Sequence, residues 1–174
     1  MKKIILTAIA VCAFGFANAQ DTKFGVKGGL DMVSFKYSET VESYLPGVPD
    51  YTVSATVSTT GFFVGGFAEF EMSDNIILQP GLNYHTASKD GFNLSYLSIP
   101  VLAKFNVGDK LNLLAGPSLY YSMESTDTDN TRFSLGVGGS YDISDELFLE
   151  TRYDMGLTGD VKVTHFMIGL GKTF

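Results

Sequence analysis

The sequence has little cysteine, tryptophan or charge. It contains 1 Cys and no Trp in 174 residues, and charged residues make up 18%. One cysteine excludes a disulfide framework and any site built from several thiolates. The formal net charge of −7 argues against a nucleic-acid binder, which needs a basic face to meet phosphates. After residue 20 no run of 18 apolar residues occurs, so we expect no transmembrane helix.

Glycine and aromatic residues are abundant instead. The chain holds 19 Gly, 14 Phe and 9 Tyr, and 45% of it is hydrophobic. This is enough apolar surface for a folded chain, and the length suits one domain. Aromatic residues favour strands. With so few charges beside them, we expect a β-protein, a membrane protein or both.

The N-terminus has the three parts of a secretory signal peptide. Met1–Lys3 is basic, Ile4–Phe16 is apolar, and residues 17–19 read Ala-Asn-Ala. The pattern predicts cleavage between Ala19 and Gln20. The apolar run is shorter than the ~20 residues that a membrane-spanning helix needs. Residues 1–19 are therefore assigned to the signal peptide and residues 20–174 to one mature domain.

The mature chain alternates apolar and polar residues with a period of two. In 132–143, Phe133, Leu135, Val137 and Tyr141 share one face, and the other face is glycine, serine and charge. Side chains alternate across a strand, so each such segment predicts a strand with one apolar face. Eight segments follow the pattern: Phe24–Met32, Gly61–Glu71, Ile76–His85, Leu94–Val107, Leu111–Met123, Arg132–Ile143, Leu147–Leu157 and Val163–Phe174.

The connections between these segments alternate in length. The short ones are Ser73–Asn75, Gly108–Lys110 and Ser144–Glu146; the longer ones are Ser38–Thr56, Ala87–Asn93, Glu124–Thr131 and Thr158–Lys162. An even number of strands with short turns at one end and longer loops at the other is typical of outer-membrane barrels. We predict an all-β fold, an eight-stranded antiparallel up-and-down transmembrane β-barrel, with the longer loops outside the cell.

The alternation alone does not say which face lies inside, because a soluble lipocalin-like barrel would place the apolar set inward. Here the polar faces carry glycine, serine and sparse charges of both signs, whereas a solvated face would be dense in charge. We therefore expect the apolar residues to face lipid. An eight-stranded barrel is filled by its own side chains, so a general diffusion pore is not expected.

The strongest candidate site is a group of charges inside the barrel. Glu150, Arg152 and Asp154 share one strand face, and Arg132 and Asp142 share a face of the preceding strand. Opposite charges on adjacent strands can pair, and we expect these five to form a lumen charge network. On the same face, Gly136 and Gly138 are expected to tolerate a small polar residue.

No catalytic residue, metal ligand or cofactor site is predicted. His85 and His165 lie on separate predicted strands without neighbouring ligand residues. A serine–histidine hydrolase would need serine, histidine and a carboxylate in register, and the many serines make a chance neighbour common. Glu69 and Glu71 have an acid–base-like spacing, but any E-x-E strand has it.

Several blocks of the chain resemble a known family. They include "GFFVGGFAEFEMSDNIILQPGLNY", "SLGVGGSYDISDELFLETRYDMGLT" and "FMIGLGKTF". Over about residues 23–174 the chain is similar to the PorT-like outer-membrane β-barrel domains of Bacteroidetes-type bacteria. The resemblance implies an eight-stranded barrel in a Gram-negative outer membrane, without a defined activity for most members. Gly169 and Phe174 match the family's C-terminal assembly signal, whereas Lys172 stands where an aromatic residue is expected.

We therefore expect a small non-enzymatic barrel in the outer membrane, with a structural or loop-mediated role in the cell envelope. Its expected partners are outer-membrane lipid, the barrel-assembly machinery during insertion, and a protein or glycan at the extracellular loops. The alternatives are a secretion or assembly accessory, as the PorT label implies, an outer-membrane lipid-modifying enzyme, and a soluble periplasmic ligand-binding barrel.

Overall fold

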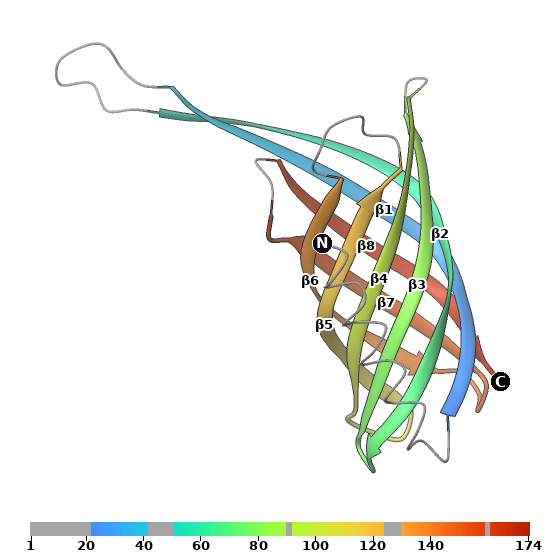
Figure 1. Ribbon diagram of the computed structural model, residues 1–174. Coiled ribbons are helices and arrows are strands. Elements are labelled where there is room, and N and C mark those ends of the chain that lie inside the picture. Colours follow the sequence, from blue (N-terminus) through green and yellow to red (C-terminus); the bar gives the residue numbers. More distant parts are fainter. Residues whose placement is uncertain (1–21, 42–50, 90–91, 124–129, 159–160) are drawn as a thin grey trace.

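The computed structural model describes residues 22–41, 51–89, 92–123, 130–158 and 161–174. These residues form one closed barrel in which each strand pairs with its neighbours in sequence and β1 pairs with β8 (Figure 1). The predicted cleavage site, Ala19 and Gln20, lies outside the described residues. The strands are β1 (Thr22–Val41), β2 (Tyr51–Ser73), β3 (Ile76–Lys89), β4 (Phe92–Asn106), β5 (Leu111–Ser122), β6 (Thr131–Asp142), β7 (Leu147–Gly156) and β8 (Lys162–Thr173).

All eight strand pairs are antiparallel, which confirms the predicted all-β, eight-stranded barrel. None of the described residues belongs to a helix long and apolar enough to cross a membrane. The start of β1 and the end of β8 meet, because the Phe174 amide donates a 2.8 Å hydrogen bond to the Phe24 carbonyl. The three short connections lie at this end of the barrel, which we call the turn end (Figure 1).

At the opposite end β1 and β2 continue far past the other strands. The β1–β8 ladder stops at Lys36 and Lys162, and the β2–β3 ladder stops at Gly61 and Ala87. Residues 37–41 therefore have no partner on β8 and residues 51–60 have none on β3, so both segments pair only within the β1–β2 ladder, and we call them the ribbon. Figure 1 shows the ribbon projecting sideways from this end, the ribbon end.

The bounds predicted for two of the longer connections are therefore too wide. Most of Ser38–Thr56 is paired strand, since β1 reaches Val41 and β2 starts at Tyr51, and most of Ala87–Asn93 belongs to β3 and β4. The ribbon sequence is rich in Ser and Thr, which we had read as a loop. Threonine and valine also favour strands, and cross-strand pairing satisfies the ribbon backbone on its inner edges.

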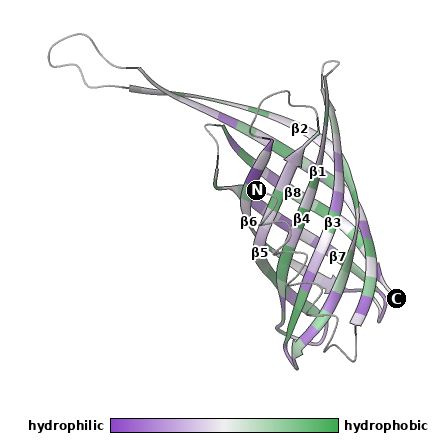
Figure 2. Ribbon diagram, viewed as in Figure 1, coloured by the Kyte–Doolittle hydropathy of each residue, from purple (hydrophilic) through white to green (hydrophobic). Residues whose placement is uncertain are grey.

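The apolar face of each strand points outward, as predicted. Phe133, Leu135, Val137 and Tyr141 on β6 are 42% to 56% exposed, whereas Ser134 and Ser140 on its other face are buried. Figure 2 shows hydrophobic and hydrophilic residues alternating along the strands. A barrel that exposes its apolar face and buries its polar one is suited to hydrocarbon, so the soluble barrel is excluded by this arrangement.

Apolar side chains fill both ends of the lumen. Toward the turn end the rings of Phe67 and Phe148 meet edge to face, with centroids 5.7 Å apart. Gly25 and Gly171 make this room, because a Cβ at either position would collide with one of the two rings. Toward the ribbon end a buried cluster closes the barrel; it consists of Val33, Tyr96, Tyr120 and Val163, with Phe35, Leu94 and Val161 packed against it.

Candidate functional site

A first group of paired charges, the ionic layer, lies toward the turn end of the lumen. The Lys27 Nζ donates to both carboxylate oxygens of Glu150 at 2.8 Å. The Lys104 Nζ donates to Glu69 at 3.0 Å. Gln79 links the two pairs, because its amide nitrogen donates to Glu69 at 3.0 Å and its oxygen accepts from Lys27 at 3.4 Å. All five side chains are buried.

The aromatic rings of the lumen lie against the same cations. Lys27 Nζ is 5.5 Å from the centre of the Phe67 ring, and Lys104 Nζ is 5.7 Å from that of Phe148. Both distances are in the range of cation–π attraction. Removing a lysine from water is costly, so each of these contacts offsets part of the cost of burial.

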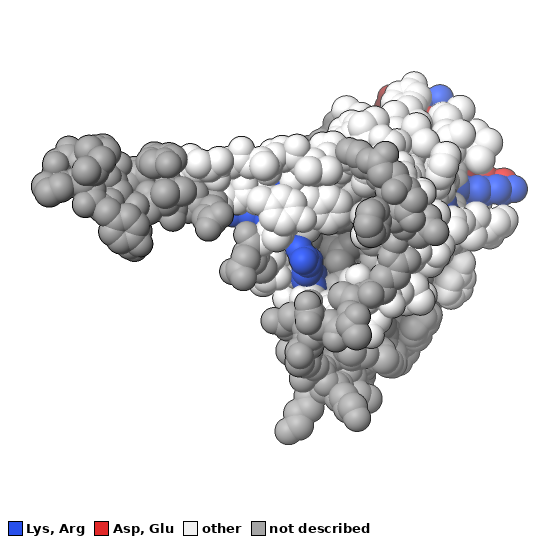
Figure 3. All heavy atoms as spheres, turned by 90° about the horizontal axis from the view of Figure 1, so that it is seen from above, with Lys and Arg blue, Asp and Glu red and all other residues white. Residues whose placement is uncertain are grey.

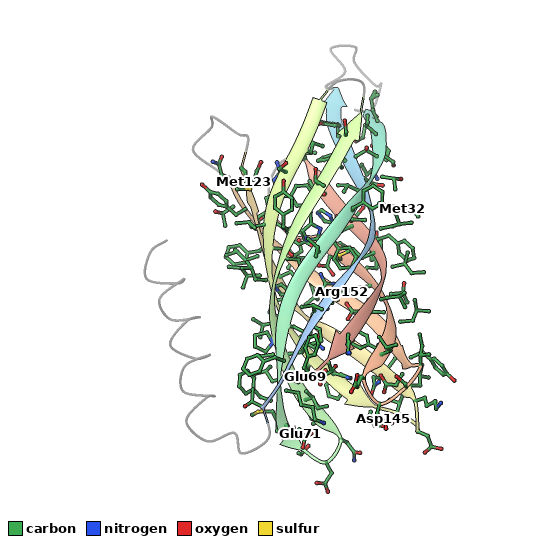
Figure 4. All side chains as sticks on the ribbon, turned by 90° about the vertical axis from the view of Figure 1, so that its right-hand side faces the viewer. Met32, Glu69, Glu71, Met123, Asp145 and Arg152 are labelled. Carbon is green, nitrogen blue, oxygen red and sulfur yellow. The ribbon has the colours of Figure 1, made fainter. Side chains whose placement is uncertain are left out.

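A second group, the arginine layer, lies at mid-depth. Arg152 Nε is 2.9 Å from Asp154 Oδ1, and Tyr120 donates a 2.6 Å hydrogen bond to the other carboxylate oxygen. Opposite charges therefore lie in direct contact in this buried layer. Arg152 Nη2 also lies 3.5 Å from the sulfur of Met167. Figure 4 shows Arg152 between Met32, near the ribbon end, and Glu69, toward the turn end.

The third group, the histidine layer, is built around Asp31 on β1. His85 Nδ1 is 2.8 Å from Asp31 Oδ2, and His165 Nδ1 is 3.2 Å from the same oxygen. Tyr96 donates to that oxygen at 3.2 Å, and His85 Nε2 is 2.8 Å from Ser98 Oγ. One carboxylate thus orients two imidazoles and a phenol from β3, β4 and β8.

Ring stacking joins the histidine layer to the arginine layer. The rings of His165 and Tyr120 are 4.3 Å apart and within 9° of parallel, and those of His85 and Tyr96 are 5.0 Å apart. The Tyr120 hydroxyl reaches Asp154 in the arginine layer. Stacked rings with fixed hydrogen bonds leave these side chains few alternative rotamers, so the lumen is a packed polar core.

Ser98, His85 and Asp31 have the order of contacts found in serine hydrolases, with both links at 2.8 Å. His85 and His165 lie on separate strands, as expected, but the closed barrel brings both to the same carboxylate. Ser98, His85 and Asp31 are at most 1% exposed, below the apolar cluster at the ribbon end. The three side chains thus form a buried hydrogen-bonded chain in which Ser98 and Asp31 orient the His85 ring.

Sequence reasoning missed this site because its parts are far apart in the chain. Asp31 lies 54 residues before His85 and 134 before His165. The available signal was the position of Asp31 itself, in line with Lys27 and Val33 on the inward face of β1. The partners become visible only when β1 closes the barrel against β8.

The five predicted lumen charges do not form one network. Glu150, Arg152 and Asp154 are buried inside; Arg152 and Asp154 pair with each other, whereas Glu150 pairs with Lys27 of β1. Opposite them on β6 lie Ser140, Gly138 and Gly136. The remaining two predicted residues lie near opposite ends of β6. Arg132 donates to the Val161 carbonyl at 3.1 Å, and Asp142 accepts from Asn112 at 3.0 Å.

The other candidate residues are placed as follows. Glu69 pairs with Lys104 in the lumen while Glu71 pairs with exposed Lys23, so the two carboxylates have separate partners. In the described ranges no group of three or more His, Cys, Asp or Glu could hold a metal. Gly169 faces the lumen against the Gly28 carbonyl, and the exposed Phe174 ring lies 5.3 Å from Lys172 Nζ.

The apolar outer surface, the closed eight-stranded ladder and the packed polar lumen define a small transmembrane β-barrel of the outer-membrane type. A family model described as the outer membrane protein beta-barrel domain matches residues 18–159. The chain therefore belongs to this family of outer-membrane barrels, and its place in the cell is the outer membrane. A search of curated proteins found no matching sequence.

Solved structures share the fold at low identity. Ail, the attachment invasion locus protein of Yersinia pestis, is 15% identical with a TM-score of 0.56, covering 89% of this chain and 100% of Ail. Ail in complex with the heparin analogue sucrose octasulfate aligns with a TM-score of 0.51, 14% identity and the same coverage. OprG from Pseudomonas aeruginosa is 13% identical with a TM-score of 0.48, covering 90% of this chain and 97% of OprG.

Proposed function

We propose that this protein is a non-enzymatic outer-membrane barrel that binds a partner outside the membrane through the ribbon. One observation carries the proposal: the ribbon exposes three large apolar side chains on a single face. Tyr37, Val53 and Val57 are 50%, 53% and 44% exposed. They alternate with polar residues, so they belong to one side of the two-stranded sheet.

The other face of the ribbon is polar and bonded within itself. Ser34 and Ser58 hydroxyls are 2.9 Å apart, and those of Ser38 and Ser54 are 3.0 Å apart. The apolar face of the ribbon is continuous with the inward side chains of Val33 and Phe35, which close the lumen at the ribbon end. A ribbon surrounded only by water gains nothing from an apolar face, so this side favours contact with a protein surface.

The described side chains of the apolar face carry no positive charge, which favours a protein over a sulfated ligand such as the heparin analogue sucrose octasulfate in the Ail complex. The burial of Ser98, His85 and Asp31 supports the non-enzymatic part of the proposal. We further propose export by residues 1–19, with cleavage between Ala19 and Gln20, and insertion by assembly machinery that reads Gly169 and Phe174. The ribbon then faces the cell exterior.

A photo-crosslinking amino acid placed on either face of the ribbon tests the proposal in intact cells. Incorporated at Val57, on the apolar face, it should give a discrete protein adduct, and at Thr56, on the opposite face, it should give none. The second substitution Tyr37→Ser should abolish the Val57 adduct while the barrel remains folded. Equal adducts from both faces, or no adduct from Val57, would contradict the proposal.

The resemblance to PorT-like domains makes a secretion or assembly apparatus the alternative source of the partner. Deletion of the gene, followed by proteomics of the secreted fraction, separates the two roles. A broad loss of secreted proteins would assign the barrel to secretion. An unchanged secreted fraction, together with a crosslinked partner, would assign it to binding at the cell surface.

A further inference from the structure

Two lysines face each other on the outside of the barrel where the ribbon begins. Lys36 and Lys162 are the last partners of the β1–β8 ladder. Both side chains are exposed, and they point away from the lumen because their neighbours Phe35 and Val163 point into it. We call them the lysine pair.

Like charges directly opposite on adjacent strands are destabilising, so the lysine pair needs an explanation. Two of the lysines at the turn end have acidic partners: Lys23 pairs with Glu71 at 3.4 Å and Lys172 with Glu146 at 3.1 Å. Among the described side chains neither lysine of the pair has an ion-pair partner. Seen from above, the described basic atoms at the base of the ribbon have no described acidic atoms beside them (Figure 3).

The lysine pair lies directly past the apolar outer surface. Four residues earlier on β1 and four later on β8, Met32 and Phe166 face each other on the same outer side. They are 42% and 41% exposed and belong to the lipid-facing band. On the outer face of β1 and β8, Ser34 and Thr164 lie between the two pairs. At about 3.3 Å per residue, the lysines stand about 13 Å along the strands from Met32 and Phe166, past the last apolar residues of β1 and β8 on this face.

We propose that the lysine pair binds a phosphate group of an anionic lipid in the leaflet at the ribbon end. Two ammonium groups on adjacent strands can flank one phosphate, and the anion then removes the repulsion between them. Lysine side chains at a membrane boundary extend toward the headgroups while their stems cover apolar surface. This binding site is independent of the partner proposed for the ribbon.

The test compares unfolding by urea in two kinds of vesicle. The refolded protein is placed in phosphatidylcholine vesicles with or without a bisphosphorylated glycolipid of the lipid A type, present in both leaflets. The double substitution Lys36→Gln/Lys162→Gln should raise or leave unchanged the urea midpoint in phosphatidylcholine, because it removes the repulsion. With the phosphorylated glycolipid it should lower the midpoint below that of the unsubstituted protein.

The matched control is Lys110→Gln, an exposed lysine in a short connection at the turn end. It should shift the midpoint by the same amount in both vesicles. Direct binding of the glycolipid, counted by native mass spectrometry, should weaken about fivefold for each lysine replaced, which corresponds to about 1 kcal/mol per basic residue.

A urea midpoint that falls only in the vesicles with glycolipid distinguishes lipid binding from a structural role of the lysine pair. If the double variant shifts the midpoint equally in both vesicles, or if Lys110→Gln weakens glycolipid binding as much, the proposal is overturned. Inorganic phosphate added to phosphatidylcholine vesicles should not stabilise the protein as the glycolipid does. An equal stabilisation by inorganic phosphate would replace the lipid by a soluble anion and overturn the proposal as well.

Discussion

At the scale of residues, the lumen contains seven buried side chains of the charged types, and each has an opposite partner or a histidine within 4 Å among the described residues. Moving an ion out of water costs several kcal/mol of free energy, and only well-formed ion pairs and hydrogen bonds offset that cost. A buried ion pair therefore adds little net stability, whereas removing one of its members strongly destabilises the folded protein. The residues are Lys27, Asp31, Glu69, Lys104, Glu150, Arg152 and Asp154.

Arg152→Met should destabilise the barrel by about 3–5 kcal/mol, because it leaves the Asp154 carboxylate buried beside a single hydrogen-bond donor, Tyr120. The measurement is the free energy of unfolding in vesicles. The double variant Arg152→Met/Asp154→Asn should recover much of the loss, since it removes the stranded charge and keeps an acceptor for Tyr120. A double variant as unstable as the single one would show that arginine packing, not charge, matters.

Gly136 and Gly138 do not have the room that the sequence suggested. A Cβ at Gly136 would collide with the Asp154 carboxylate, and one at Gly138 with the Thr151 carbonyl. Gly136→Ala should therefore cost about 1–3 kcal/mol of unfolding free energy, as overpacked cores do. The control is Gly139→Ala on the same strand, where the nearest atom to a Cβ is 3.4 Å away. Equal costs at Gly136 and Gly139 would mean that the Asp154 side chain moves aside freely.

At the scale of elements, β1 and β2 change their environment along their length while their alternation continues. Within the barrel their inward residues are enclosed, but past the last rungs of the β1–β8 and β2–β3 ladders the same face is open. Val137 on β6 and Val57 on the ribbon are 56% and 44% exposed. The two valines are thus similarly exposed but lie in different surroundings: Val137 faces lipid, whereas Val57 faces water or a partner.

Val137→Arg should destabilise the barrel by about 2–4 kcal/mol, because it places a cation in hydrocarbon near mid-membrane. Val57→Arg should change the free energy of unfolding by less than about 0.5 kcal/mol, because the ribbon lies outside the closed barrel. Urea titration of both variants in vesicles compares the same chemical change in the two surroundings. Tolerance of arginine at position 137 would mean that β6 does not face lipid.

At the scale of the whole molecule, the barrel is closed by three polar layers and by apolar side chains at both of its ends. Arg152, Leu102, Leu114 and Val33, from four different strands, are at most 2% exposed. Eight strands enclose just enough space for such side chains. The barrel is therefore a filled cylinder from which the ribbon projects at one end.

The refolded protein should show no large, steady conductance in planar bilayers, because the side chains of the three layers occupy the lumen. A porin recorded in the same bilayers is the positive control. Large and weakly selective conductance would show that the layers open, and it would move the function from binding to transport.

Local patterns sufficed for much of the fold. A period of two over most of the mature chain, with glycine, serine and sparse mixed charge on one face, was enough to predict eight antiparallel strands with their apolar faces outward. This works because a strand alternates its side chains regardless of its distant neighbours. The burial of Glu150, Arg152 and Asp154 followed from the same rule. The Ser- and Thr-rich ribbon was misread because composition alone does not separate a loop from a polar strand.

The pairing inside the barrel was decided only by its tertiary structure. Asp31 meets His85 and His165, and Lys27 meets Glu150, because ring closure brings together strands that are far apart in sequence. No local pattern contains the register between β1 and β8, on which the lysine pair also depends. The sequence by itself thus determined which face each residue takes. The closed barrel decided which residues meet, since contacts across a lumen depend on the relative stagger of all eight strands.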